Sequence, residues 1–204
     1  MKSKKKVQPC AMKRRWFVLG APSVILGSVL AGPVRALSVT PRQSEGPFYP
    51  RVLPEDSDAD LTSFNGQRVS GDVIEIVGRL LAASGEPIAR GEVEIWHCDP
   101  NGVYAHVGQE TVPHFQGFGA MRTDESGGYR FRTTLPGLYP GRARHVHVKA
   151  RGKRGLFLTT QMYFPGEADN GQDFLLMRAS DPLALIAQKE PGSPPKFRFD
   201  IILA

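Results

Sequence analysis

Residues 128–164 read GYRFRTTLPGLYPGRARHVHVKARGKRGLFLTTQMYF and contain three runs in which side-chain character alternates. The runs cover 129–133, 145–148 and 157–164. Because successive side chains of a strand point to opposite faces of a sheet, this alternation predicts three β-strands. The Pro136-Gly137 pair lies between the first two runs and is typical of a turn.

The same pattern continues on both sides of this stretch. Further short β-type runs occupy 73–77, 93–98 and 196–201, with turn residues at 84–87, 99–102 and 124–128. Only 169–188 has a helical pattern, and only in short pieces. We therefore predict a mostly β fold, a β-sandwich or open barrel of short antiparallel strands with irregular loops and few short helices. It would occupy residues 71–204, preceded by an irregular N-terminal arm at 37–70 that is rich in Pro, Ser, Asp and Gly.

Residues 1–36 are predicted to be a signal peptide rather than part of the fold. Arg14-Arg15 is followed by Trp-Phe-Val-Leu and an apolar run to about Gly32, with a cleavage site near Val34-Arg35-Ala36. Paired arginines before such a run resemble a twin-arginine signal, although Lys13 stands where Ser or Thr is usual. The alternative is a membrane anchor, but the run is short and proline breaks it. We expect an exported protein, periplasmic or secreted, with no membrane contact in its mature form.

Charge and cysteine content narrow the classes of function. The chain has 26 basic and 20 acidic residues, and eight of the basic ones lie in residues 1–36, which have no acidic residue. The remainder is mildly acidic, so nucleic-acid binding is not expected. Cys10 would leave with the signal, and Cys98 then has no partner for an internal disulfide.

His145-Val146-His147 indicates either a metal site or two surface or hydrogen-bonded histidines. Residues i and i+2 of a strand lie on one face, about 6.5 Å apart, so both imidazoles can reach one ion. Tyr104 follows the turn after the 93–98 run, and Tyr139 precedes the histidines. Two phenols beside two imidazoles suit a hard trivalent metal such as iron(III), which would deprotonate both phenols.

An ordered series of motifs resembles the intradiol ring-cleavage dioxygenases, the family of catechol and protocatechuate 3,4-dioxygenases. The series runs through nearly all of residues 40–165. Its members are TPRQSEGPFY (40–49), GEPI (85–88), EIWHCD (94–99), GVY (102–104), RTD (122–124), GYRF (128–131), PGLYP (136–140) and HVH (145–147). Each motif is common, but their order along the chain is specific.

The resemblance implies a ligand set and two further site residues. Iron(III) would be held by Tyr104, Tyr139, His145 and His147, with Tyr139 displaced when the substrate chelates the metal. Arg142 would stabilise negative charge on the substrate, and Gln161 would lie near the same pocket. Arg144 is the alternative to Arg142, because the segment between Tyr139 and His145 is short here.

The resemblance also implies a reaction. A catechol-type diol would react with O2 between its two hydroxyl-bearing carbons and give a muconate-type dicarboxylate. The motifs specify neither the ring substituents nor the number of subunits. Two other classes stay open at this point: a β-sandwich binding module that has lost the chemistry, and a zinc hydrolase.

Overall fold

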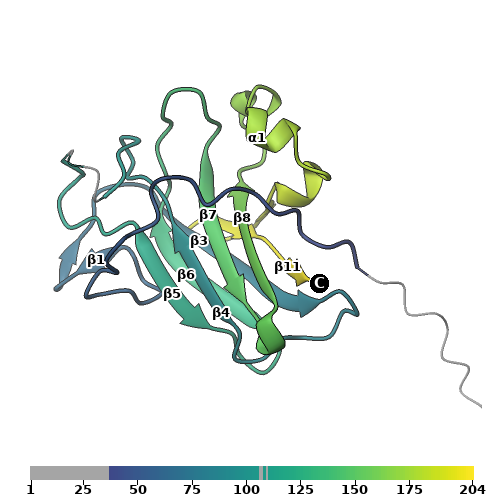
Figure 1. The fold of residues 1–204 in the computed structure, drawn as a ribbon. Coiled ribbons are helices and arrows are strands. Elements are labelled where there is room, and N and C mark those ends of the chain that lie inside the picture. Colours follow the sequence, from purple (N-terminus) through teal and green to yellow (C-terminus); the bar gives the residue numbers. More distant parts are fainter. Residues whose placement is uncertain (1–36, 106–107, 109) are drawn as a thin grey trace, which may run out of the picture. The chain divides into compact units, whose positions relative to one another are not determined.

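The computed structural model describes residues 37–105, 108 and 110–204. The predicted signal peptide therefore lies outside the described residues. The described chain is built from β-strands and a few short helices, as the alternation predicts (Figure 1). No helix within the described ranges is long and apolar enough to cross a membrane.

The first sheet is organised around one long strand, β3 (Val73–Ala82). Strand β6 (Gly128–Thr134) pairs with it antiparallel, whereas β10 (Lys196–Arg198) and β11 (Ile201–Leu203) pair with its other edge in parallel. Strand β9 (Gln188–Glu190) extends the sheet beyond β10. The 196–201 run is thus split into two strands that both pair with β3. These two pairings are parallel, whereas the strands were predicted to be antiparallel, as the other pairings are.

A close approach of backbone explains the split. A Cβ on Gly78, in the middle of β3, would lie 2.0 Å from the carbonyl oxygen of Phe199, between β10 and β11. Only glycine leaves room for the chain there. The Tyr129 hydroxyl, on the strand paired with Gly78, donates a hydrogen bond to the same carbonyl and stabilises the junction.

The second sheet is fully antiparallel and carries the candidate site. Its order is β5 (Phe118–Arg122), β4 (Glu92–Trp96), β7 (His145–Arg151) and β8 (Phe157–Tyr163). Residues 118–122 had not been predicted as a strand. The inward side chains of both sheets form one buried cluster, so the architecture is a β-sandwich. Members of this cluster include Ile76, Phe131, Ile95, Val148 and Met162.

Part of the N-terminal arm (residues 37–70) lies over the outer face of the second sheet, where Pro41 and Ser44 accept hydrogen bonds from side chains of β8. Another part of the arm, at Asp60, bridges to Arg132 of β6 in the first sheet. Figure 1 shows this dark segment crossing β8 and β7. Thr40 N–H donates to the backbone carbonyl of Ile202 in β11, and Gln43 N–H donates to the backbone carbonyl of Thr159 in β8. The arm is irregular except for a two-stranded ribbon, β1 (Ser63–Phe64) and β2 (Gln67–Arg68).

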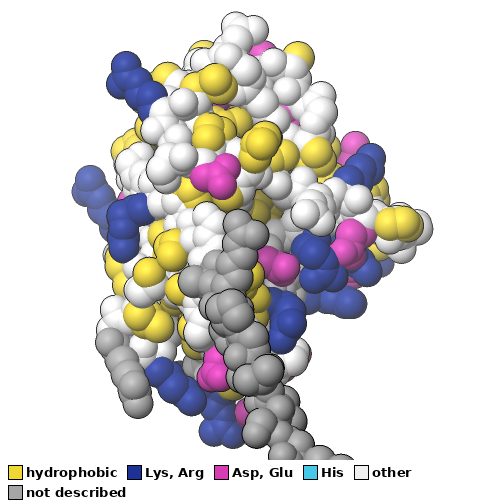
Figure 2. All heavy atoms as spheres, turned by 90° about the vertical axis from the view of Figure 1, so that its right-hand side faces the viewer, with side chains coloured by type: hydrophobic (Ala, Val, Ile, Leu, Met, Phe, Trp, Pro, Cys, Tyr) yellow, Lys and Arg dark blue, Asp and Glu magenta, His cyan; other side chains and the backbone are white. Residues whose placement is uncertain are grey.

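Four short helical turns complete the described chain. They are η1 (Lys153–Gly155), η2 (Ala168–Gly171), α1 (Phe174–Met177) and η3 (Leu183–Leu185). The last three lie in the region predicted to be helical in short pieces. Asp173 caps α1 by accepting hydrogen bonds from Leu175 N–H and Leu176 N–H, which fixes that carboxylate. Phe174 and Met177 of α1 and Leu183 of η3 are exposed hydrophobic side chains. Figure 2 shows hydrophobic side chains scattered among polar atoms on one face of the molecule.

Candidate metal centre and active site

Strand β7 places the two histidines on the covered face of the second sheet. Val146 and Val148 point into the core between the sheets, so His145 and His147 point the other way. Each histidine is only 2 % exposed, because the N-terminal arm lies over this face. Their ring centroids are 5.0 Å apart, as expected for neighbours on one face of a strand.

The two tyrosines reach the same place from loops. Tyr104 follows a turn in which Asn101 N–H and Val103 N–H donate to the buried Asp99 carboxylate. The same carboxylate accepts Val112 N–H from the chain beyond Tyr104. Tyr139 lies in the segment between β6 and β7. The ring centroid of Tyr104 is 5.8 Å from that of Tyr139 and 6.1 Å from that of His147. The Tyr139 hydroxyl lies 3.3 Å from His145 Nε2. All four predicted ligands therefore converge.

Unpartnered polar atoms lie in this cluster. The hydroxyl of Tyr104 and both ring nitrogens of His147 are buried without a hydrogen-bond partner. Burial of a polar group without a partner costs about 1–3 kcal/mol, so native structures rarely tolerate several in one place. A bound cation would satisfy them. Two imidazoles and two phenolic oxygens fit a hard trivalent ion such as iron(III).

Burial shifts the pKa of all four side chains of the cluster. Burial, followed by the neighbouring Arg142 cation, lowers the pKa of His145 to about 4, so its imidazole is neutral and able to bind metal. Burial and then the nearby His145 lower the pKa of His147 well below its ordinary value. Burial raises the pKa of both Tyr104 and Tyr139. In the metal-free protein the phenols stay neutral, and a trivalent ion would deprotonate them.

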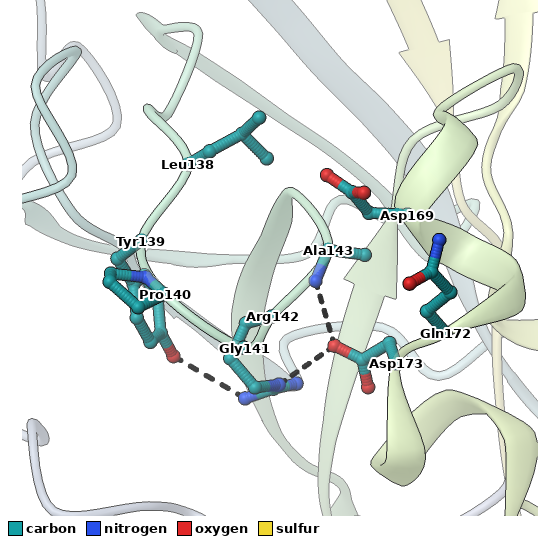
Figure 3. A pocket seen from close by; sticks show the side chains of 9 residues that line it. All are labelled: Leu138, Tyr139, Pro140, Gly141, Arg142, Ala143, Asp169, Gln172 and Asp173. Carbon is teal, nitrogen blue, oxygen red and sulfur yellow. Dashed lines mark hydrogen bonds and ion pairs between the residues drawn. The ribbon is translucent and has the colours of Figure 1, made fainter.

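Arg142 is partly buried and held in one position beside Tyr139 (Figure 3). Its Nε donates to Asp173 Oδ2 at 2.7 Å, and its Nη1 lies 3.3 Å from the Tyr139 hydroxyl. Its Nη2 donates to Gln161 Oε1 at 2.6 Å and to the Tyr163 hydroxyl at 3.0 Å. The guanidinium is therefore a fixed cation that faces the proposed leaving ligand.

Gln161 lies on the ligand face, and Arg144 does not reach it. In the pairing of β7 with β8, Gln161 stands directly opposite His147. Arg144 instead donates to Glu167 Oε1 at 2.9 Å and to the carbonyl of Pro136. This geometry favours Arg142 over Arg144 as the charge-stabilising residue.

Two residues of this network were missed by the sequence analysis. The Asp173 carboxylate is fully buried, pairs with Arg142 and accepts Ala143 N–H at 2.9 Å. The Tyr163 hydroxyl donates to Gln43 Oε1 at 3.2 Å and so connects the network to the N-terminal arm. The one available signal was Asp173 immediately before a short apolar run, which is typical of a helix cap.

A cavity of about 520 Å³ borders this site from outside. It lies between the 138–143 segment and residues 169–173, and its walls include Tyr139, Arg142 and Asp173 (Figure 3). None of the other three predicted ligands lines it. The cavity therefore adjoins the Tyr139–Arg142 wall rather than the ligand cluster itself.

A family model described as "Dioxygenase" matches residues 44–204. The chain belongs to this dioxygenase family. It is 32% identical over 206 residues to the protocatechuate 3,4-dioxygenase beta chain of Burkholderia cepacia, covering 86% of this chain and 85% of that one. It is 31% identical over 199 residues to catechol 1,2-dioxygenase of Acinetobacter baylyi, covering 81% of this chain. These relatives support the intradiol dioxygenases as the family, as the motifs predict.

Solved structures agree with this membership. The dioxygenase domain of a dioxygenase carbohydrate-binding protein fusion from Streptomyces sp. SirexAA-E is 33% identical, with a TM-score of 0.68, and the match covers 81% of this dioxygenase chain and 98% of that domain. The chain spans only 62% of the Acinetobacter baylyi enzyme, so it corresponds to part of that longer protein.

Neither a binding module that has lost the chemistry nor a zinc hydrolase gains support from the structure or the relatives. The relatives are named dioxygenases, and all four predicted donors converge, which disfavours a binding module without chemistry. Within the described ranges, no group of three His, Cys, Asp or Glu side chains is placed to hold a metal. A zinc hydrolase usually needs such a group, whereas this dioxygenase has two tyrosines in the cluster.

Proposed function

We propose that this dioxygenase cleaves a catechol-type diol between its two hydroxyl-bearing carbons, using O2 and a non-haem iron(III) ion, to give a muconate-type dicarboxylate. The observation that carries the proposal is the convergence of two buried imidazoles and two phenols with several unpartnered polar atoms. Relatives named catechol 1,2-dioxygenase and protocatechuate 3,4-dioxygenase support the class of substrate.

The four ligands would divide into two kinds. His145 and His147 are neutral, buried and fixed on one strand, so they supply permanent ligands. Tyr104 is buried beneath Phe48, whose ring stacks on it at 4.2 Å between centroids. Tyr139 is only partly buried and lies at the edge of the cluster. These differences favour Tyr139 as the ligand that leaves and accepts a proton from the substrate.

Arg142 and Gln161 would then act on the bound diol. When bound, iron(III) would withdraw electron density from the diol and prepare its ring for reaction with O2. The Arg142 guanidinium is already 3.3 Å from the Tyr139 hydroxyl, so it can stabilise a Tyr139 phenolate or an anionic diol oxygen that takes its place. Asp173 and Gln161 hold the Arg142 guanidinium in place before the diol binds. The guanidinium can therefore stabilise this negative charge with little reorganisation.

Metal analysis and oxygen uptake test the proposal. Purified protein loaded with iron(III) should be red-brown, because tyrosinate ligands give a charge-transfer band in the visible range. With catechol, hydroxyquinol and protocatechuate as a panel, at least one should consume O2 and give a product with the mass of the substrate plus two oxygen atoms. A protein that stays colourless after iron loading would contradict the metal assignment.

We also propose that the chain is exported by the twin-arginine route. The Arg14-Arg15 pair before an apolar run supports this, and a cofactor-loaded domain without a disulfide suits export in the folded state. In the described chain Cys98 is free and buried.

A further inference from the structure

His147 lacks the hydrogen bond that usually orients a metal-binding histidine. Such a histidine normally donates its second ring nitrogen to a carbonyl or carboxylate, which fixes the ring. His145 follows this rule, because its Nδ1 lies 2.6 Å from the carbonyl of Ala143. Neither ring nitrogen of His147 has any partner. Something other than a hydrogen bond must therefore hold its ring.

Packing takes the place of that hydrogen bond. The Trp96 ring stacks on His147, with centroids 4.8 Å apart and an interplanar angle of 13°. Gly46 of the N-terminal arm closes the edge of the imidazole: a Cβ there would lie 3.3 Å from His147 Cε1. The indole nitrogen of Trp96 is itself buried without a partner. The rings of Trp96 and His147 are therefore positioned by packing contacts and not by hydrogen bonds from their ring nitrogens.

A buried cation lies beside this stack. Lys149 is the third residue of β7 on the ligand face, and it is 5% exposed. Its Nζ lies 3.3 Å from the centroid of the Tyr49 ring and 5.5 Å from that of Trp96, both within cation–π range. Its Nζ also pairs with Glu45 Oε2 at 2.6 Å. Glu45 immediately precedes Gly46.

Among the described residues, Glu45 is the ion-pair partner of Lys149, and Glu94 lies opposite Lys149 in the pairing of β4 with β7. The neighbouring Glu94 carboxylate is already occupied, because it accepts from the Tyr49 hydroxyl at 2.9 Å and from Arg151 Nη1 at 2.5 Å. The bond to Glu94 fixes the Tyr49 ring so that its face meets the ammonium. Tyr49 also contacts Trp96 edge to face, at 5.0 Å between centroids.

We propose that Lys149 is a positioning residue for His147. Its ammonium holds Trp96 against the imidazole through the cation–π contacts, and its pair with Glu45 seats Gly46 on the imidazole edge. The inference rests on the proposed function, since it requires a metal bound at His147. It assigns the N-terminal arm a part in the metal site, in addition to covering the sheet.

The test compares iron release from matched variants of the full dioxygenase. Lys149→Met removes the cation but keeps an unbranched side chain of similar length. Lys196→Met is the control, because Lys196 lies in β10 of the other sheet and pairs with Glu75 at 4.0 Å. Each protein is loaded with iron(III) and given excess chelator while the visible band is followed. The electron paramagnetic resonance spectrum records the ligand geometry independently.

Lys149→Met should release iron about tenfold faster than wild type, at the lower end of the 10- to 100-fold effects of groups that orient metal ligands. Its resonance spectrum should change, and Lys149→Arg, which keeps the charge, should restore most of both properties. Lys196→Met should match wild type. Glu45→Gln should also speed release and gives a second test if Lys149→Met does not fold.

Wild-type release rates and spectra in the Lys149 and Glu45 variants would overturn the inference while leaving the iron site intact. A wild-type protein that takes up no iron would instead overturn the proposed function, and this inference with it. The two failures are therefore distinguishable by the wild-type iron content alone.

Discussion

Replacing Asp173 with Asn should reduce both stability and turnover. Oδ2 of Asp173 accepts Arg142 Nε at 2.7 Å and Ala143 N–H at 2.9 Å, while Oδ1 accepts two N–H groups of α1 at 3.0 Å. An amide has only one oxygen, so one of these pairs of donors would face an NH2 group. The carboxylate is fully buried and Arg142 is 11% exposed, so the pair counts as buried.

Breaking a buried ion pair by removing one partner costs about 3–5 kcal/mol. Arg142 keeps its bonds to Gln161 and Tyr163 in the variant, so we expect a loss at the lower end, about 3 kcal/mol. Chemical denaturation at neutral pH measures it. Asp124→Asn is the control, because that carboxylate also accepts backbone N–H groups but lies in an exposed turn far along the chain from the site. The Asp124→Asn variant should consume oxygen at the wild-type rate.

The pH dependence of this loss gives a second check. Burial alone would raise the pKa of the Asp173 carboxyl, but hydrogen bonds from Arg142, Leu176 N–H and Ala143 N–H hold the pKa below its ordinary value of 3.8. The carboxylate therefore stabilises the fold above that value, and the contribution is lost as pH falls through the folded-state pKa. The stability gap between wild type and Asp173→Asn should be constant from neutral pH to about pH 4 and shrink below it.

Turnover should fall as well, because the Arg142 guanidinium loses the partner that fixes Nε. A displacement of about 1 Å in a positioning group can cost up to about a hundredfold in rate, so we expect a fall between tenfold and a hundredfold. Oxygen uptake under saturating substrate measures it, with iron content as the check that the ligands are intact. Wild-type stability together with wild-type turnover would refute the role of Asp173.

Three further variants test the ligands and the export signal. Tyr139→Phe should still bind iron through three ligands but with an altered visible band, and its turnover should fall sharply because the proton acceptor is gone; an unchanged band would show that Tyr139 is no ligand. His147→Ala should lose both iron and activity, which metal analysis of the purified variant checks. Replacing Arg14 and Arg15 together with Lys should leave precursor inside the cell, and unchanged secretion would contradict the twin-arginine route.

The strands and their faces were predictable because alternation has a period of two residues. Once 145–148 is a strand, Val146 must face the core and His145 must share the other face with His147. The pairing of β10 and β11 with β3 was not predictable in the same way. It joins segments more than a hundred residues apart, and it depends on the backbone contact at Gly78 that no local pattern expresses.

The candidate site was predictable only where its residues lie in motifs. The two tyrosines were candidates from their places beside the turn and the histidines, whereas Arg142 and Gln161 entered through the resemblance. The structure brings these residues together with the histidines. Asp173 could not be found, because its partner Arg142 lies 31 residues earlier and its own surroundings indicate only a helix cap. A side chain whose role is to fix another side chain has no signature of its own in a single sequence.

Lys149 illustrates a different limit. A lysine in an alternating strand indicates a face exposed to solvent, yet this face is buried beneath the N-terminal arm. The sequence does indicate that this face of the sheet is buried, but the indication lies in β4 and not in β7. Val93 and Ile95 point into the core, but Trp96, on the opposite face, is also fully buried. A strand with large apolar residues on both faces must be covered on both sides. Because Trp96 pairs directly with His147, the same cover extends over the two histidines proposed as metal ligands and the lysine beside them.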